Sequence, residues 1–413
     1  MSKTLGFQTV EWNKVNWRKL EKTLFKLQKR IFRASVRGDI RAVRKLQKTL
    51  MKSWTAKMIA VRRVTQENKG KKTAGIDGVK SLTNRQRLTL VANLKISKKA
   101  KPTRRVWIPK PGRSEKRPLG IPTMYDRALQ ALTKQALEPE WEARFEPNSY
   151  GFRPGRSCHD AIEAIFTGIN QKPKWVLDAD IAKCFDKINH NALLTKLNTY
   201  PSLRRLIKSW LKAGVMDNGT FSPTEEGTPQ GGVISPLLAN IALHGMEKRI
   251  KQFAETMKGS KSKNRNALNL VRYADDFVIM HKDHYVVKEC QRIINIWLND
   301  MGLELKSSKT RITHTMDGFD FLGFNIRQYQ VGKNQSKQGF KTIIKPSKEK
   351  VLEHYRQLAK VIDQYRAAPQ TALISRLKPI IRGWCNYYSS VCSKETFNTL
   401  GHMLWKKLAL MGI

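Results

Sequence analysis

The stretch LVRYADDFVIM, residues 270–280, places Asp275 and Asp276 side by side between two runs of apolar and β-forming residues. These runs predict two short strands joined by a tight turn whose tip is YADD. At such a turn, neighbouring side chains need not point to opposite faces, so both carboxylates can lie near one place. Two like charges this close repel each other and are tolerated in water or beside a cation. The stretch therefore predicts either a solvated acidic turn or part of a metal site.

A second acidic segment, WVLDADIAKCFDKINH at residues 175–190, favours the metal site. Strand alternation places Asp178 and Asp180 on one face. If Asp180 is brought together with Asp275 and Asp276, the three carboxylates would hold two Mg²⁺ ions, which prefer a few carboxylates plus substrate phosphates. One ion would activate an attacking hydroxyl, and the other would stabilise the leaving pyrophosphate. The pattern predicts nucleotidyl transfer.

The charge of the chain indicates a polyanionic partner. The 413 residues include 78 Lys and Arg against 33 Asp and Glu, a formal net charge of +45, and residues 1–120 alone carry +28. Such an excess favours nucleic acid. The sequence contains neither a run of about 18 apolar residues nor an apolar signal-peptide core, so we expect no membrane partner and a soluble protein of the bacterial cytoplasm or an organelle. The five cysteines are scattered, without a CxxC pair, and are expected to be reduced thiols.

The pattern along the chain predicts three parts. Residues 1–72 predict a basic helical N-terminal extension, followed by a Gly- and Lys-rich loop. Strand-like and helical segments alternate over residues 73–335. Residues 336–413 predict a third, mainly helical part, in which the helical set begins at Ser347 and interleaves basic and aromatic residues. The Lys- and Ser-rich stretch KGSKSKNRNA, residues 258–267, predicts a loop.

Nine blocks of the sequence, in order from residue 73 to residue 388, resemble those of group II intron-encoded reverse transcriptases, the maturases. The resemblance implies an α+β right-hand polymerase with fingers, a palm on a ferredoxin-like sheet, a helical thumb or maturase (X) domain and a helical N-terminal extension. The family often adds a DNA-binding region and an HNH endonuclease. No such block precedes Ile413, so we expect no C-terminal HNH endonuclease. The blocks are TAGIDGV, RRVWIPKPGRSEKRPLGIPTMYDRALQ, NSYGFRPGRSCHDAI, LDADIAKCFDKINH, GTPQGGVISPLLANI, LVRYADDFVIM, LKSSKTRI, FDFLGFNI and LKPIIRGWCNYY.

The resemblance assigns the catalytic and metal-binding residues. Asp180, Asp275 and Asp276 match the carboxylates that hold two Mg²⁺ ions, with the backbone carbonyl near Ile181 as an additional ligand. Lys309 matches a palm lysine near the leaving pyrophosphate, where it would act as a proton donor. Asp178 stays open between a ligand and a supporting or solvated carboxylate.

The resemblance also assigns contacts to nucleotide and primer. Phe185 matches the residue beneath the sugar of the incoming nucleotide, where a bulky ring leaves no room for a 2′-hydroxyl; the alternative is an ordinary core aromatic. Lys110 and Arg117 match triphosphate contacts, and Gln230 matches a nucleotide contact. The residues expected at primer or template are Gly231, Phe321, Leu322, Gly323 and Arg382, although the FLGF residues also resemble core.

Taken together, the blocks imply an RNA-directed DNA polymerase encoded by a group II intron, which binds intron RNA, assists splicing and copies RNA into cDNA. The expected partners are group II intron RNA, an RNA template with a DNA primer, dNTPs and target DNA, with the protein as a monomer or dimer on RNA. One alternative is a splicing maturase with a vestigial polymerase site. Another is a reverse transcriptase that serves a CRISPR-associated or diversity-generating system. Intact LDADI, YADD and PQGG favour the polymerase.

Overall fold

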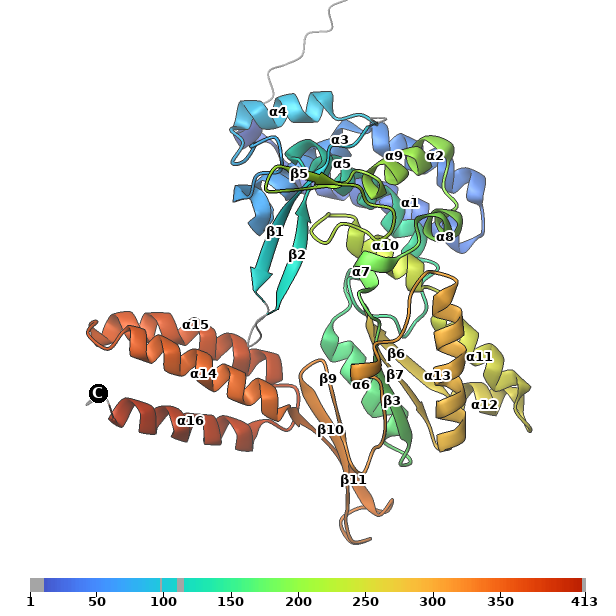
Figure 1. Ribbon diagram of the computed structural model, residues 1–413, viewed down its shortest axis with the longest axis vertical. Helices are drawn as coiled ribbons and strands as arrows, with labels where there is room; N and C mark the ends of the chain where they lie inside the picture. Colours follow the sequence, from blue (N-terminus) through green and yellow to red (C-terminus); the bar gives the residue numbers. More distant parts are fainter. Residues whose placement is uncertain (1–10, 97–98, 110–114, 411–413) are drawn as a thin grey trace, which may run out of the picture. The chain divides into compact units, whose positions relative to one another are not determined.

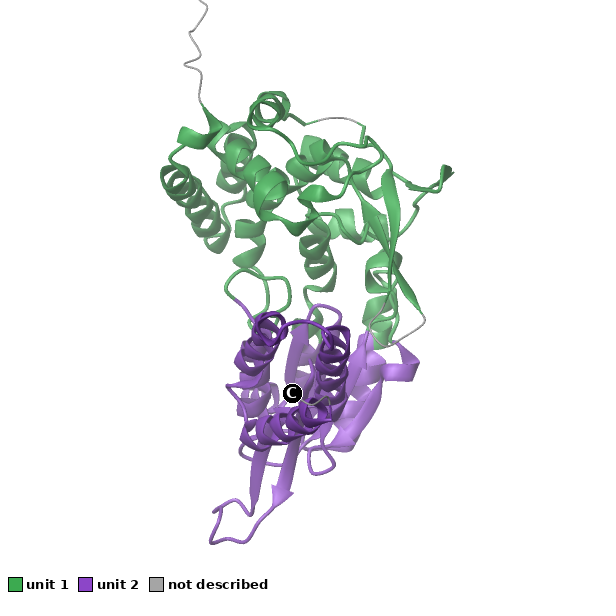
Figure 2. Cartoon of the chain, turned by 90° about the vertical axis from the view of Figure 1, so that its left-hand side faces the viewer, with its two compact units in different colours: residues 1–155, 181–249, 295–305 green, residues 156–180, 250–294, 306–413 purple. Residues whose placement is uncertain are grey.

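The computed structural model describes residues 11–96, 99–109 and 115–410. They form two compact units, each built from separate stretches of chain (Figure 2). Within the described ranges, no helix is both long enough and apolar enough to cross a bilayer. Unit 1 comprises residues 1–155, 181–249 and 295–305, and unit 2 comprises residues 156–180, 250–294 and 306–413.

Unit 1 is organised around helix α5 (Met124–Glu142), which is buried on nearly all sides. The basic N-terminal segment packs against it as amphipathic helices, with buried apolar residues at helical spacing and Lys and Arg outside. Glu140 of α5 is 1% exposed and accepts hydrogen bonds from Arg44 at 2.6 Å and Gln47 at 2.7 Å. A buried carboxylate needs such partners, so this pair ties the basic segment to α5. The packed helices are α1 (Trp17–Val36), α2 (Ile40–Lys52) and α3 (Trp54–Arg62).

A four-stranded sheet of order β2-β1-β4-β5 completes unit 1 (Figure 1). Its strands β1 and β2 pair antiparallel. The strands are β1 (Thr103–Pro109), β2 (Lys116–Ile121), β4 (Val215–Asp217) and β5 (Thr220–Ser222). Short turns of helix are Trp12–Lys14, Arg63–Glu67 and Lys69–Lys72. The other helices are α4 (Asn84–Asn93), α7 (Cys184–Lys187), α8 (His190–Leu197), α9 (Pro201–Leu211) and α10 (Ser235–Leu243).

The main sheet of unit 2 has the order β6-β7-β3-β8, and all its neighbours are antiparallel. When its four strands are numbered 1 to 4 along the chain (β3, β6, β7, β8), their order in the sheet is that of a ferredoxin-like sheet. This arrangement confirms the predicted α+β fold. Most apolar residues of β3 and β7 are buried, and Asp180 and Asp276 stand at the paired ends of the two strands. The strands are β3 (Trp175–Asp180), β6 (Asn269–Tyr273), β7 (Asp276–His281) and β8 (Arg311–His314).

The prediction of a loop over residues 258–267 is wrong, because residues Lys261–Ala267 form helix α12. The side chain of Ser260 accepts a hydrogen bond from the backbone N–H of Lys263 and so caps the helix. Local capping thus creates a helix where apolar periodicity gives no signal. The other helices around this part of the chain are α6 (Cys158–Ile169), α11 (Met246–Thr256) and α13 (His284–Asn299).

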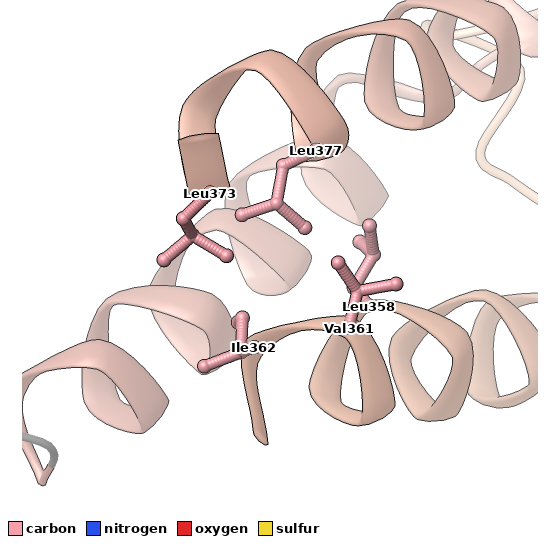
Figure 3. Packing of buried hydrophobic residues seen from close by; sticks show 5 residues of the cluster. All are labelled: Leu358, Val361, Ile362, Leu373 and Leu377. Carbon is pink, nitrogen blue, oxygen red and sulfur yellow. The ribbon is translucent and has the colours of Figure 1, made fainter. Parts of the chain in front are cut away.

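The C-terminal part of unit 2 is a small sheet followed by three helices. The helices bury a shared apolar cluster of Leu358, Val361, Ile362, Leu373 and Leu377 (Figure 3). The sheet has the order β11-β10-β9, and the first helix after it begins at Lys348, next to the predicted start of the helical set at Ser347. The strands are β9 (Phe319–Phe321), β10 (Phe324–Gln330) and β11 (Phe340–Pro346). The helices are α14 (Lys348–Gln364), α15 (Gln370–Tyr388) and α16 (Lys394–Ala409).

Candidate active site

The two acidic segments meet in the main sheet of unit 2. Strand β3 pairs with β7 so that Asp180 lies directly opposite Asp276. Strands β6 and β7 form the predicted hairpin, in which Tyr273 pairs with Asp276 across a two-residue turn. Asp275 is the second residue of that turn. The prediction that YADD is the tip of a tight turn is confirmed, and the neighbouring strand brings a third acid to it.

A buried arginine supports the YADD turn. Ala274, the first residue of the turn, has φ +58°, a conformation that costs energy for a residue with a Cβ. Arg272 on β6 is 1% exposed, and its guanidinium donates a hydrogen bond of 2.9 Å to the carbonyl of Ala274. This bond holds the carbonyl of the strained residue. Arg272 thereby fixes the backbone from which Asp275 and Asp276 project.

Lys309 contacts the carboxylates from the segment before β8. It ends the helical turn Ser307–Lys309, and its ammonium lies 2.8 Å from a carboxylate oxygen of Asp180. A hydrogen bond from the backbone N–H of Lys306 to the carbonyl of Asp180 ties the same segment to β3. The predicted catalytic lysine therefore lies beside a predicted metal ligand.

The carboxylates are electrostatically strained. Burial raises the pKa of Asp276 to about 6, and the neighbouring charges of Asp275 and Asp180 contribute to this rise, against the opposing effect of Lys309. Burial, followed by the charge of Asp276, raises the pKa of Asp178 to about 7. Burial thus makes ionisation of both carboxyl groups costly, and their acidic neighbours add to that cost.

A pocket of about 480 Å³ opens at this edge, entirely within unit 2. Asp180, Asp276 and Lys309 line it on one side. Phe321 and Leu322, predicted to contact the primer, line it from the turn between β9 and β10. The structure thus brings three of the four predicted catalytic residues and two of the five predicted primer or template contacts into one cavity. Asp178 also faces this pocket, as strand alternation predicts.

The site suits a divalent cation in its donor chemistry. Among the residues that the structure describes, no three His, Cys, Asp or Glu side chains meet as a ready metal cluster, and the ammonium of Lys309 is the cation that contacts Asp180. The opposed carboxylates are nevertheless the hard oxygen donors that Mg²⁺ prefers. Ile181, predicted to add a carbonyl, directly follows Asp180 and pairs as an isolated bridge with Leu305.

Unit 1 holds the residues predicted to contact the nucleotide. Phe185 lies on α7, is half-buried, and its ring meets that of Phe152 edge to face at 6.1 Å. The side-chain amide of Gln230 donates hydrogen bonds of 3.1 and 3.2 Å to the carboxylate oxygens of Asp186. Burial raises the pKa of Asp186, while the bond from Gln230 lowers it. Asp186 fixes the orientation of the Gln230 amide.

The glycines of the PQGG loop allow close backbone packing. Gly231 has φ +114°, and a Cβ there would lie 3.0 Å from the carbonyl oxygen of Gly120 on β2. Gly227 has φ +80°, and a Cβ there would lie 2.5 Å from the carbonyl oxygen of Asp186. These glycines therefore let the loop pack closely against the protein's own backbone, at β2 and at α7.

The remaining predicted contacts lie on exposed surfaces. Arg117 is exposed on β2, paired with Ile108 of β1. Lys110 lies outside the described residues. Arg382 is exposed on α15, whereas Trp384 packs inward, stacked on His354 at 4.6 Å.

Sequence reasoning missed three kinds of residue at these sites. Arg272 could have been found as a charge inside an otherwise apolar strand. Asp186 lies within the second acidic segment, but nothing in the sequence pairs it with Gln230. Tyr387 and Tyr388 contact the turn between β9 and β10 across 65 positions each, a contact for which periodicity carries no signal.

The opposed acids of a ferredoxin-like sheet, their lysine and the adjoining pocket define the palm of a nucleic-acid polymerase. A family model described as reverse transcriptase (RNA-dependent DNA polymerase) matches residues 108–326. Models described as the N-terminal domain of reverse transcriptase and the group II intron maturase-specific domain match residues 12–94 and 351–412. The first of these models covers more than half of the chain, which therefore belongs to the reverse transcriptase family. It is an RNA-directed DNA polymerase of the group II intron type.

Two relatives and one solved structure are similar to this chain. The chain is 32% identical over 333 residues to Protein YkfC of Escherichia coli strain K12, a match that covers 71% of this chain and 85% of that protein. It is 28% identical over 420 residues to Group II intron-encoded protein LtrA of Lactococcus lactis subsp. cremoris, with 82% and 69% covered. A solved structure of apo telomerase from Candida tropicalis aligns with a TM-score of 0.45 and 15% identity, over 62% of this chain and 61% of that one.

Proposed function

We propose that this reverse transcriptase copies RNA into DNA with two Mg²⁺ ions held by Asp180, Asp275 and Asp276, with the carbonyl of Ile181 as an additional ligand. The observation that carries the proposal is the direct opposition of Asp180 and Asp276 beside the YADD turn, with burial and neighbouring acids raising the pKa of Asp276. Carboxylates in that state gain most from a divalent counter-ion.

The chain's own residues orient the reaction. When bound, the ions supply charge stabilisation for the attacking and leaving oxygens. Asp180 and Asp276 fix the donor geometry from two paired strands, and Arg272 keeps the turn that carries Asp275 in place. Lys309 lies close enough to Asp180 to exchange that contact for the pyrophosphate and to donate a proton there.

Unit 1 supplies recognition of the nucleotide in this proposal. Phe185 excludes a 2′-hydroxyl with a ring that the structure leaves half-buried. Gln230 presents an amide oriented by Asp186. Arg117 and Lys110 grip the triphosphate.

The partners in this proposal are an RNA template with a DNA primer, dNTPs, target DNA and the group II intron RNA whose splicing the protein assists. The match of residues 351–412 to the maturase-specific domain and the name of the relative LtrA support the intron RNA. Gly231, Phe321, Leu322, Gly323 and Arg382 are the proposed contacts with primer and template. We retain residues 1–72, 73–335 and 336–413 as the extension, polymerase and thumb, and the bacterial cytoplasm or an organelle as the compartment.

The test is to replace Asp275 and Asp276 by alanine. Primer extension on RNA should fall by several orders of magnitude, because the double variant lacks two of three proposed metal ligands. Affinity for intron RNA at fixed salt should be unchanged, because two anions are removed from a chain of net charge +45. Splicing of a cognate intron should also persist, since the RNA supplies that chemistry.

The matched control is the Asp300→Ala/Asp317→Ala double variant, which removes two exposed acids. It should extend primers as the parent does. Undiminished synthesis by the Asp275→Ala/Asp276→Ala variant would show that the YADD turn is only solvated. Equal loss of RNA affinity and synthesis would instead indicate misfolding.

A further inference from the structure

The turn between β9 and β10 is conformationally strained. Phe321 pairs with Phe324, so Leu322 and Gly323 form a two-residue turn. Leu322 has φ +51° and Gly323 has φ +84°. A leucine in the left-handed region costs energy that the surroundings must offset. The turn therefore needs support from outside its own hairpin.

Two consecutive tyrosines at the end of α15 provide that support. The hydroxyl of Tyr387 donates a hydrogen bond to the carbonyl of Leu322 at 3.3 Å, and that of Tyr388 donates one to the carbonyl of Gly323 at 3.0 Å. The backbone N–H of Ser347, just before α14, reaches the carbonyl of Gly323 at 2.9 Å. Both carbonyls of the turn are thus held by the C-terminal helical set.

The tyrosines are themselves fixed in place. The ring of Phe324 stacks on Tyr387 with centroids 5.3 Å apart and meets Tyr388 edge to face at 5.1 Å. The imidazole of His159, on α6, lies 2.6 Å from the carbonyl of Tyr387. Burial raises the pKa of Tyr388 to about 12, so its hydroxyl keeps the proton that it donates. Rings held this closely give each hydroxyl a fixed direction.

This cluster lies next to the catalytic edge. Phe321 and Leu322 line the same pocket as Asp180 and Asp276. A shift of the turn therefore changes the wall of the cavity in which the primer end would lie. The tyrosines reach that cavity only through the two carbonyls that they bind.

We propose that Tyr387 and Tyr388 are positioning residues for polymerisation, which hold the strained Leu322–Gly323 turn in the conformation that receives the primer terminus. This inference rests on the proposed function, because it takes the pocket beside Asp180 and Asp276 as the place of the primer end. The thumb then contributes to catalysis by fixing a turn of the palm, in addition to any contact of its own with nucleic acid.

The experiment compares Tyr387→Phe, Tyr388→Phe and the double variant with the parent. Phenylalanine keeps the ring packing and removes only the hydroxyl. Loss of one hydrogen bond should raise the rate of primer-terminus release about fivefold, and loss of both should raise it further. The measurement is the length distribution of products in a single encounter with primer–template, with a trap for free enzyme. The KM for dNTP and the melting temperature should stay within about twofold and about 2 °C of the parent, respectively.

A control removes the same hydroxyl elsewhere: Tyr355→Phe on α14 should leave product length unchanged. A second arm uses Gly323→Ala, whose Cβ would lie 3.0 Å from the hydroxyl of Tyr388. If the tyrosine holds the turn, Gly323→Ala should shorten products less in the Tyr388→Phe background than in the parent.

Product lengths equal to the parent in the double Phe variant, or additive effects in the Gly323→Ala cycle, would overturn the inference. A parent enzyme that adds no nucleotide to a primer on RNA would instead overturn the proposed function. Single-nucleotide addition by the parent is therefore measured first. A fall in melting temperature that accounts for the shorter products in both single variants would also count against a positioning role.

Discussion

Asp180 illustrates how a single residue at the active site meets conflicting demands. It lies opposite Asp276, and its negative charge raises the cost of ionising Asp276. The charge of Asp180 is itself balanced by the ammonium of Lys309 at 2.8 Å. An ion pair of this kind is exchangeable, because the lysine side chain is about half exposed and can leave. In the proposed mechanism, the same lysine neutralises the carboxylate before the metal binds and contacts phosphate afterwards.

Phe185 provides a prediction at the same scale. Phe185→Ala should open space beneath the sugar and raise the ratio of kcat/KM for ribonucleotides to that for deoxynucleotides by about tenfold or more, since sterically excluded groups are rejected by a few kcal/mol. Steady-state incorporation of matched rNTP and dNTP measures the ratio. Phe221→Ala, a large exposed aromatic of unit 1, is the control and should leave the ratio unchanged. An unchanged ratio in Phe185→Ala would make the residue ordinary core.

At the scale of the element, the β6–β7 hairpin depends on a buried cation. Arg272→Met keeps the length of the side chain and removes the donor to the carbonyl of Ala274. We expect nucleotide addition to slow by about fivefold or more, because the strained turn loses a bond to a charged donor. Primer–template affinity should change little. Single-turnover rates and equilibrium binding test the two halves of this expectation.

The control for the hairpin is Arg327→Met. Arg327 is exposed and donates to the carbonyl of Met316 at 2.9 Å, so this substitution removes a similar bond away from the YADD turn. Equal slowing by both variants would mean that the effect is not specific to the hairpin.

The C-terminal helical set supplies a pH-dependent prediction. His354 is buried on α14 and stacks on Trp384, and burial lowers its pKa to about 4. The unfolded chain binds this proton near pH 6.5, whereas the folded chain binds it only near pH 4. The contribution of His354 to the free energy of unfolding should therefore be fully present above about pH 6.5. It should fall by on the order of 2 kcal/mol as the pH is lowered to about 4.

His354→Phe keeps the stack and cannot titrate. The free energy of unfolding, measured with urea, should fall less for the variant than for the parent between pH 7 and pH 4. Because other groups titrate in both proteins, only this difference reports on His354. A difference that does not vary with pH would show that folding leaves the pKa of His354 unchanged.

Local signals predicted most elements of the fold and the acids of the site. Alternation in LDADI and the apolar flanks of YADD are encoded within a few residues, so the strands and their turn could be inferred. Helix α12 could not, because its cap at Ser260 acts without apolar periodicity. Pairings between distant segments were also out of reach, such as Lys309 with Asp180 or Tyr388 with Gly323. These pairings depend on tertiary packing, for which one sequence carries no pairwise signal.

At the scale of the molecule, the excess of positive charge is partly structural. Helix α2 forms a basic hollow of about 510 Å³, yet its cations serve different purposes. Arg44 is committed to buried Glu140, and the ammonium of Lys48 lies 5.4 Å from the ring centroid of Tyr200. The exposed cations of this hollow that remain for a polyanion are Arg41, Lys45 and Lys52.

This division leads to a prediction for RNA binding. The affinity of the parent should fall with salt with a log-log slope of several units, because many phosphates are neutralised and counterions are released. Arg41→Gln/Lys45→Gln/Lys52→Gln should reduce that slope by up to about 3, roughly 1 for each phosphate that a cation no longer neutralises.

The control is Lys258→Gln/Lys261→Gln/Lys263→Gln, which lowers the net charge of the chain by the same amount at α12 and just before it. This control separates binding at α2 from the attraction due to the total charge. Equal changes in slope for the two triple variants would mean that RNA responds to the total charge, whereas a slope near zero for the parent would rule out phosphate-led binding altogether. We expect the α2 variant to show the larger change in slope, because its cations surround a hollow on the helix that packs against α5, where a phosphate can meet several of them at once.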